Sequence, residues 1–143
     1  MWSTEASATT QASPEAIWTL WADVGNWKEW DPGVEDSSIG GSFAEGTRYE
    51  LKPKGGPKVT SVLTEVRPGE EFSDHTRLPL ANLDFSHEVE RVGEETRVTH
   101  RVEISGPLAF VFARLMGRGM ERGLPETVRN LARLAEEREG DRS

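Results

Sequence analysis

Two histidines and one aspartate are the residues of this sequence whose types could carry proton transfer or ligand binding. His87 and His100 flank the pair Gly93-Glu94, which is typical of a tight turn between two antiparallel strands. A two-residue turn there places His87 opposite His100, with their Cβ atoms about 5 Å apart. The register also puts three apolar pairs on the same face, so both imidazoles are expected to be buried; the pairs are Val89 with Val98, Phe85 with Val102, and Leu83 with Ile104.

Asp74 lies in the preceding strand and shares the parity of Phe72, so it faces inward if Phe72 does. The loop around Pro79 leaves the register open, and one pairing sets Asp74 against His87. These three groups in an apolar cavity could bind a ligand oxygen or move a proton. The alternative is a hydrogen-bonded structural network in the core. Two imidazoles and a carboxylate are also ligand types for a transition metal, but no spacing motif supports a metal site. At most one of two adjacent histidines should be charged at pH 7.

Length and composition exclude several classes of protein. A chain of 143 residues is the size of one domain, and its net charge of −8 disfavours nucleic acid and anionic membranes as partners. The absence of cysteine excludes disulfides, cysteine-ligated zinc and iron–sulfur clusters. No apolar run is long enough to span a membrane, and the first residues lack the pattern of a signal peptide, so a cytoplasmic protein is expected. Common catalytic motifs such as Gly-x-Ser-x-Gly, the P-loop and His-Glu-x-x-His are missing.

Strands and two short helices are predicted to precede one long helix. A first strand is expected at Trp2–Gln11, followed by a helix that begins at Ser13-Pro14-Glu15 and a helical turn at Trp27–Pro32. Spacings near 10–12 residues between turn signals then indicate an antiparallel meander rather than crossover connections. Its six strands are predicted at Val34–Ile39, Thr47–Pro53, Val59–Arg67, Glu71–Leu78, Leu83–Val92 and Glu95–Ser105.

The last element is predicted to be an amphipathic helix from Pro107 to about Glu136. Glycines and Pro125 should bend or interrupt it between Gly117 and Pro125. Residues 1–139 should form a single domain, with 140–143 as a flexible tail. The apolar stripe, expected to face the sheet, comprises Leu108, Val111, Phe112, Leu115, Met116, Met120, Leu124, Val128, Leu131 and Leu134. The arginines expected on the solvent face are Arg114, Arg118, Arg122, Arg129 and Arg133.

This order of elements predicts an α+β fold in which a curved sheet of about seven strands wraps around the long helix. Such a sheet leaves space for a small molecule between itself and the helix. The order resembles the START-like, Bet v 1-like helix-grip superfamily, also called SRPBCC, and the local sequence is similar to its polyketide cyclase/dehydrase-like bacterial group. The segments that carry the resemblance are Pro14–Trp18, Asp23–Pro32, Gly46-Thr47, Val62–Gly69, Gly93–His100 and Ser105–Leu108.

The resemblance implies binding of a small hydrophobic or aromatic, lipid- or polyketide-like molecule, without a cofactor. The alternatives that it leaves open are a polyketide aromatase/cyclase-type enzyme and a protein-interaction module similar to Hsp90 activators. No catalytic residue is carried over, because the group has no shared catalytic motif. A monomer or homodimer is expected. Trp18 and Trp27 are expected in the core, and Trp30 near the cavity mouth. The predicted ligand-binding residues are Trp30, Tyr49, Asp74, Phe85, His87, His100, Phe112, Met116 and Met120.

Overall fold

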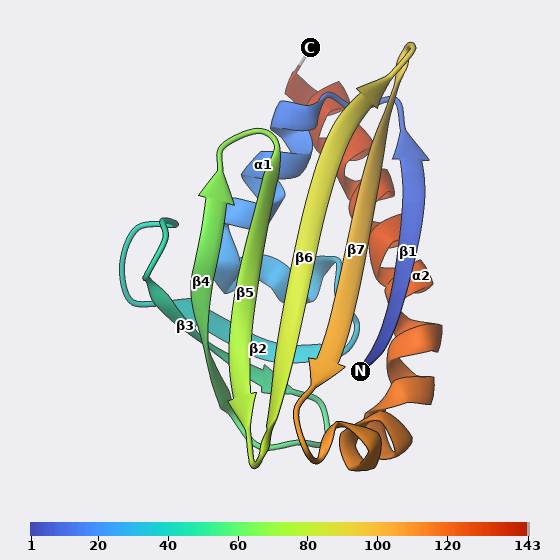
Figure 1. The fold of residues 1–143 in the computed structure, drawn as a ribbon. Helices are drawn as coiled ribbons and strands as arrows, with labels where there is room; N and C mark the ends of the chain where they lie inside the picture. The colour runs from blue at the N-terminus through green and yellow to red at the C-terminus, as the bar shows by residue number, and fades with distance from the viewer. Residues whose placement is uncertain (143) are drawn as a thin grey trace.

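The computed structural model describes residues 1–142 and has the predicted helix-grip architecture. A seven-stranded antiparallel sheet, in the order β1-β7-β6-β5-β4-β3-β2, curves around a long C-terminal helix, α2, with the shorter helices on the same side (Figure 1). The helices are α1 (Pro14–Ala22), the 3₁₀ helix η1 (Val24–Glu29) and α2 (Ala109–Arg142). The strands are β1 (Trp2–Thr10), β2 (Val34–Ile39), β3 (Arg48–Pro53), β4 (Val59–Arg67), β5 (Glu71–Leu78), β6 (Ala81–Val92) and β7 (Glu95–Ser105).

Local chemistry accounts for the first helix. Ser13 is its N-cap: the side-chain oxygen accepts a hydrogen bond from the Ala16 backbone N–H at 3.2 Å. Pro14 occupies the first helical turn, where no N–H is needed, and Glu15 complements the positive end of the helix dipole. The second short helix begins at Val24, three residues before the predicted Trp27, and ends at Glu29.

The register of the β6–β7 hairpin is the predicted one, with His87 opposite His100. Of the pairings left open for Asp74, the one with His87 does not occur: Asp74 lies opposite Phe85, and Phe72 lies opposite His87. The reason is the turn between β5 and β6, where Leu80 adopts a left-handed φ of 53°. Pro79 and Leu80 therefore form a two-residue turn, Leu78 pairs with Ala81, and β6 begins two residues before the predicted Leu83.

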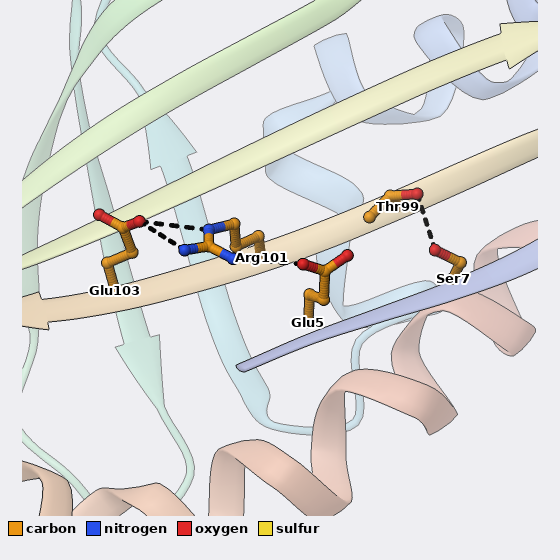
Figure 2. A network of polar contacts seen from close by, with 5 residues as sticks. All are labelled: Glu5, Ser7, Thr99, Arg101 and Glu103. Atoms are coloured by element: carbon orange, nitrogen blue, oxygen red, sulfur yellow. Dashed lines mark hydrogen bonds and ion pairs between the residues drawn. The ribbon is translucent and has the colours of Figure 1, made fainter. Parts of the chain in front are cut away.

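The two faces of the sheet differ in chemistry. On the face that carries His100 and Val102, side chains are buried against the helices. The opposite face carries a polar network across β1 and β7, in which Arg101 contacts Glu103 at 2.7 Å and Glu5 at 3.2 Å (Figure 2). Ser7 and Thr99 share a hydrogen bond of 2.7 Å on the same strands. This alternation confirms the inward orientation predicted for the two histidines.

Helix α2 departs from the prediction in three respects. It extends to Arg142, six residues past the expected end, and Ser143 of the predicted tail lies outside the described residues. It is continuous through residues 117–125, with Pro125 in its interior, so of the two expected outcomes, a bend or an interruption, the interruption does not occur. Leu115 is 75% exposed rather than turned to the sheet. The reason is that Gly117 is buried and packs against the Trp2 indole. Residues two positions apart lie on nearly opposite sides of an α-helix, so Leu115 faces solvent.

Two hydrophobic clusters form the core. The larger one joins α1, η1 and the C-terminal half of α2 to the sheet, and it contains Trp21, Trp27, Phe72 and Leu131. The smaller one, around Leu83 and Val102, lies under the N-terminal half of α2. The five arginines expected on the solvent face of α2 are all exposed. No helix within residues 1–142 is long and apolar enough to cross a membrane.

Candidate ligand cavity

A cavity of about 480 Å³ lies between the concave face of the sheet and the N-terminal half of α2. We call it the main cavity. Strands β2 to β6 and helix α2 supply its apolar wall, which includes Leu51 on β3, Leu78 on β5, Leu83 and Phe85 on β6, and Met116 and Met120 on α2. Gly119 and Gly123 also line it, and no heavy atom would lie within 4 Å of a Cβ at either position. The helix therefore presents little side-chain volume to this part of the sheet.

A smaller pocket of about 80 Å³ adjoins the main cavity and contains most of the ionisable groups predicted from the sequence. We call it the inner pocket. Tyr49, Phe85 and Leu124 line both spaces, so the two are neighbours along the concave face. The residues that line the inner pocket are Trp27, Trp30, Asp31, Tyr49, Leu51, Asp74, Phe85, His87, His100, Leu124 and Thr127.

The two histidines form an edge-to-face pair whose ring centroids are 4.6 Å apart. The Trp21 indole N–H donates to Nε2 of His100 at 3.2 Å, so that nitrogen is unprotonated and the proton of the neutral ring is on Nδ1. In His87 the Nδ1 lies 3.2 Å from the Phe72 carbonyl oxygen. A carbonyl can only accept, so His87 carries its proton on Nδ1 and leaves Nε2 as an acceptor. Both rings are held in one orientation by these contacts.

Burial keeps both histidines neutral. Desolvation lowers the pKa of His87 to about 3, although its contact with the Phe72 carbonyl acts in the opposite direction. Desolvation also lowers the pKa of His100 well below its ordinary value, and the neighbouring His87 adds to this shift. The inner pocket therefore contains no imidazolium at neutral pH.

Asp74 is the acid of the inner pocket and is only 2% exposed. Desolvation raises the pKa of its carboxyl group to about 7, and the charge of Asp84 contributes, while the Tyr49 hydroxyl opposes the shift by hydrogen bonding. Burial, followed by the charge of Asp74, raises the pKa of Tyr49 well above its ordinary value, so the phenol stays protonated. At neutral pH the Asp74 carboxyl is thus divided between acid and carboxylate.

Asp31 is a second carboxyl group at the junction of the two spaces, and it was not predicted as a site residue. Its Oδ1 accepts from the Gly33 N–H at 2.9 Å and lies 3.5 Å from the Thr127 hydroxyl. Desolvation raises the pKa of Asp31. The sequence could have indicated Asp31 as a site residue, because it follows Trp30 directly. Thr127 could be found only from the packing of α2.

Eight of the nine predicted ligand-binding residues line one or both spaces; in the inner pocket they are Trp30, Tyr49, Asp74, Phe85, His87 and His100, and in the main cavity Tyr49, Phe85, Met116 and Met120. The exception is Phe112, which packs on the Leu83 cluster without lining either space. Trp30 is buried beside His100 rather than at a cavity mouth. Among the lining residues that were not predicted are Ser61 and Thr76, which hydrogen-bond each other at 2.5 Å.

No group of three histidine, cysteine, aspartate or glutamate side chains within residues 1–142 could hold a metal ion. The ionisable groups that the inner pocket offers are the two carboxyl groups of Asp74 and Asp31, the Tyr49 hydroxyl and the two imidazoles. Around it are aromatic rings: Phe72 stacks on His87 with ring centroids 3.9 Å apart.

The chain matches a known family. Residues 1–136 match the family model described as "Polyketide cyclase / dehydrase and lipid transport". The chain therefore belongs to that family, in agreement with the resemblance found in the sequence. A comparison with curated proteins finds no match.

Similar solved structures support the fold. The di-domain ARO/CYC StfQ from the steffimycin biosynthetic pathway superposes with a TM-score of 0.77 at 15% identity, over 96% of this chain and 51% of that one. The di-domain ARO/CYC BexL from the BE-7585A biosynthetic pathway gives 0.72 at 17% identity, over 93% of this chain and 46% of that one. This chain thus spans about half of each di-domain protein. TTHA0849 from Thermus thermophilus gives 0.73 at 16% identity, with 93% and 96% covered.

Proposed function

We propose that this protein binds a small, mainly apolar molecule, aromatic or lipid-like, in the main cavity. The observation that carries the proposal is a space of about 480 Å³ walled by Leu83, Phe85, Met116 and Met120. Ligand sites in proteins commonly have volumes of about 300–1,000 Å³ and combine apolar walls with a few polar groups. Methionine side chains adapt their shape at low cost, which suits a wall that must close around a ligand.

A roomy apolar cavity favours ligand binding over the protein-interaction module, which a small pocket closed by side chains would have favoured. Membership of the polyketide cyclase/dehydrase and lipid transport family supports a cavity-based role. The family description includes both catalysts and carriers, so it is compatible with binding alone or with binding followed by reaction.

A cyclase-type reaction is the second candidate, and Asp74 is the observation that favours it. A carboxyl group whose pKa is raised to about 7 can both accept and donate a proton near neutral pH. In a cyclisation it could take a proton from a carbon next to a carbonyl and return it to an oxygen. Tyr49 keeps its proton and hydrogen-bonds Asp74, so it would hold that carboxyl group in position.

Binding can be tested by filling the main cavity from the helix. Met120→Trp adds volume at the cavity wall, whereas Leu115→Trp adds the same ring at a position of α2 that is 75% exposed. Titration of a hydrophobic fluorescent dye should show at least about a tenfold loss of affinity in Met120→Trp and no change in Leu115→Trp. Native mass spectrometry of the purified protein should reveal co-purified small molecules in the wild type and fewer in Met120→Trp. Equal dye affinity in a folded Met120→Trp variant would place the binding site elsewhere.

A further inference from the structure

Two polar atoms of the inner pocket are buried without any hydrogen-bond partner: the Nε1 of Trp30 and the Oδ1 of Asp74. The two residues are 4% and 2% exposed, and both line the pocket. A buried indole N–H is a donor only, and leaving it unpaired is unfavourable. Among the described residues these are the two buried side-chain atoms in this condition, and both belong to one space of about 80 Å³. Because both unpaired atoms line the same pocket, we infer that a bound molecule supplies their hydrogen-bond partner.

The hydrogen-bonding groups around the pocket define the partner's chemistry. Trp30 offers an N–H, and Asp74 offers an O–H when protonated. His100 has its Nε2 lone pair occupied by Trp21, whereas the Nε2 of His87 has no such contact and can accept. Two donors and one acceptor suit an oxygen atom, either a carbonyl or a hydroxyl group.

The charges around the pocket exclude an anion. Both imidazoles are neutral, and the ionisable groups that line the pocket with Asp74 are Asp31, Tyr49, His87 and His100. Asp84, whose charge also raises the pKa of Asp74, lies opposite His75 and contacts it outside the pocket. None of the lining groups is a cation at neutral pH, and the residues of α2 that line the pocket, Leu124 and Thr127, are uncharged. A carboxylate placed here would lose its hydration and gain no opposite charge.

We propose that the inner pocket is a subsite for a neutral oxygen at the end of a ring ligand that occupies the main cavity, with Trp30 Nε1–H and the Asp74 carboxyl group as its hydrogen-bond donors. The proposal rests on the proposed function, since the ring is held by the main cavity. It adds the class of ligand: a flat, uncharged molecule with a carbonyl or hydroxyl group on one edge. A fully saturated hydrocarbon chain without oxygen would leave the two donors unpaired.

The volumes support this division of the ligand. About 80 Å³ accommodates a few atoms, whereas about 480 Å³ accommodates fused rings. Tyr49 and Phe85 line both spaces, so a ring placed between sheet and helix has its edge beside the inner pocket. The edge that enters must therefore carry the polar atom.

A matched pair of probes tests the subsite: α-tetralone carries one carbonyl oxygen, and tetralin is the same bicyclic hydrocarbon without it. Neither probe titrates. Calorimetric or fluorescence titration should show that α-tetralone binds wild-type protein about tenfold more tightly than tetralin near pH 5.5, the effect of one or two buried hydrogen bonds. Trp30→Phe should remove most of that preference and leave tetralin binding within about twofold. Trp18→Phe, a substitution at an indole outside both spaces, is the matched control and should change neither affinity.

The role of Asp74 is tested by pH with the same probes. Affinity of wild-type protein for α-tetralone should fall between about pH 5.5 and about pH 8.5, as the carboxyl group loses the proton it donates. Tetralin affinity should stay constant, and Asp74→Asn, whose amide N–H does not titrate in this range, should bind α-tetralone equally at both pH values.

The outcomes separate the two proposals. Equal affinity for α-tetralone and tetralin in wild-type protein would overturn the oxygen subsite and leave the hydrophobic cavity intact. A preference for α-tetralone that survives in Trp30→Phe and does not change with pH would also overturn it. Binding of neither probe, together with no effect of Met120→Trp on dye binding, would overturn the proposed function itself.

Discussion

The two halves of α2 lie on the same concave sheet but meet it in different ways. In the C-terminal half, Val128, Leu131 and Ala135 are each 0% exposed and pack into a core filled by Trp21 and Phe72. In the N-terminal half, Met116 and Met120 are only partly buried and line the main cavity, while Ala109 and Leu124 pack on the smaller cluster. The C-terminal half is tightly packed against the sheet, whereas the N-terminal half contributes to the wall of a cavity.

The difference comes from side-chain volume and from what else covers the sheet. Helix α1 and η1 place Trp21 and Trp27 between the sheet and the C-terminal half of α2, whereas the described residues place no helix under the N-terminal half. At that level α2 offers Gly119 and Gly123, with open space around both. A continuous helix can therefore be a structural element along one part of its length and a ligand-site wall along another.

The largest effect on stability should come from truncating a phenylalanine in the packed region, compared with a phenylalanine beside the main cavity. Phe72→Ala removes a ring that is 0% exposed and stacks on His87, so unfolding free energy should fall by roughly 3–5 kcal/mol. Phe85→Ala removes a partly buried ring beside the main cavity and should cost less than about 2 kcal/mol. Chemical denaturation of both variants measures the difference. Equal costs would mean that the two halves are packed alike.

Asp74→Asn should stabilise the protein at alkaline pH. Because the pKa of Asp74 rises from 3.8 to about 7 on folding, the folded state holds a proton that the unfolded chain releases between these values. Stability contributed at this site is thus highest below about pH 4 and is lost as pH rises through about 7. At about pH 8 the variant should exceed the wild type by up to roughly 4 kcal/mol, and the gain should vanish near pH 4. Denaturation across this range checks the slope, and a pH-independent difference would contradict it.

His87→Gln should reduce sensitivity to acid. The pKa of His87 falls from 6.5 to about 3 on folding. Between these pH values the unfolded chain binds a proton at His87 and the folded state does not, so wild-type stability declines as pH falls below about 6.5. Between about pH 7 and about pH 5 the wild type should lose roughly 2 kcal/mol more than the variant. At pH 7 the variant itself should be weaker by roughly 1–3 kcal/mol, because the contact with the Phe72 carbonyl is lost. Parallel stability curves would show that His87 is hydrated in the folded state.

The smallest effect separates two glycines of the same helix. Gly119→Ala places a methyl group in open space and replaces a poor helix former, so stability should rise by about 0.5–1 kcal/mol. Gly117→Ala places its Cβ 3.1 Å from Cζ2 of Trp2, and the indole must move, so no gain is expected. Thermal melting of both variants makes the comparison, which fails if the two substitutions shift Tm equally.

Sequence patterns predicted what depends on period and turn chemistry. The pairing of His87 with His100 followed from Gly93 and an unbroken alternation, and it is confirmed. The register of Asp74 could not be decided from the sequence, because it depends on Leu80 taking a left-handed conformation that its residue type does not favour. The stripe on α2 could not show that Gly117 packs against Trp2, and so the exposure of Leu115 was missed.

The site was predictable to the extent that strand parity decides it. Asp74, His87 and His100 face inward, as their alternation indicated. The volumes of the two spaces, the placement of Asp31 beside Thr127 and the unpaired Nε1 of Trp30 depend on contacts between distant segments. No local pattern encodes such contacts, and they could be found only in the folded structure.

Strand β1 forms one edge of the sheet and pairs with β7, from Trp2 opposite Ile104 to Thr10 opposite Thr96. The connection that follows it, at Gln11 and Ser13, is hydrogen-bonded to Glu136 and Glu139 of α2, 125 and 126 residues later in the chain. On a ribosome, the first strand therefore has no strand partner until β7, the last strand of the sheet in chain order, has been synthesised. Pairings of such high sequence separation fold slowly, and an unpaired strand edge is exposed in the meantime. Strand β1, which is synthesised first, must therefore stay unpaired and unaggregated until β7 can pair with it.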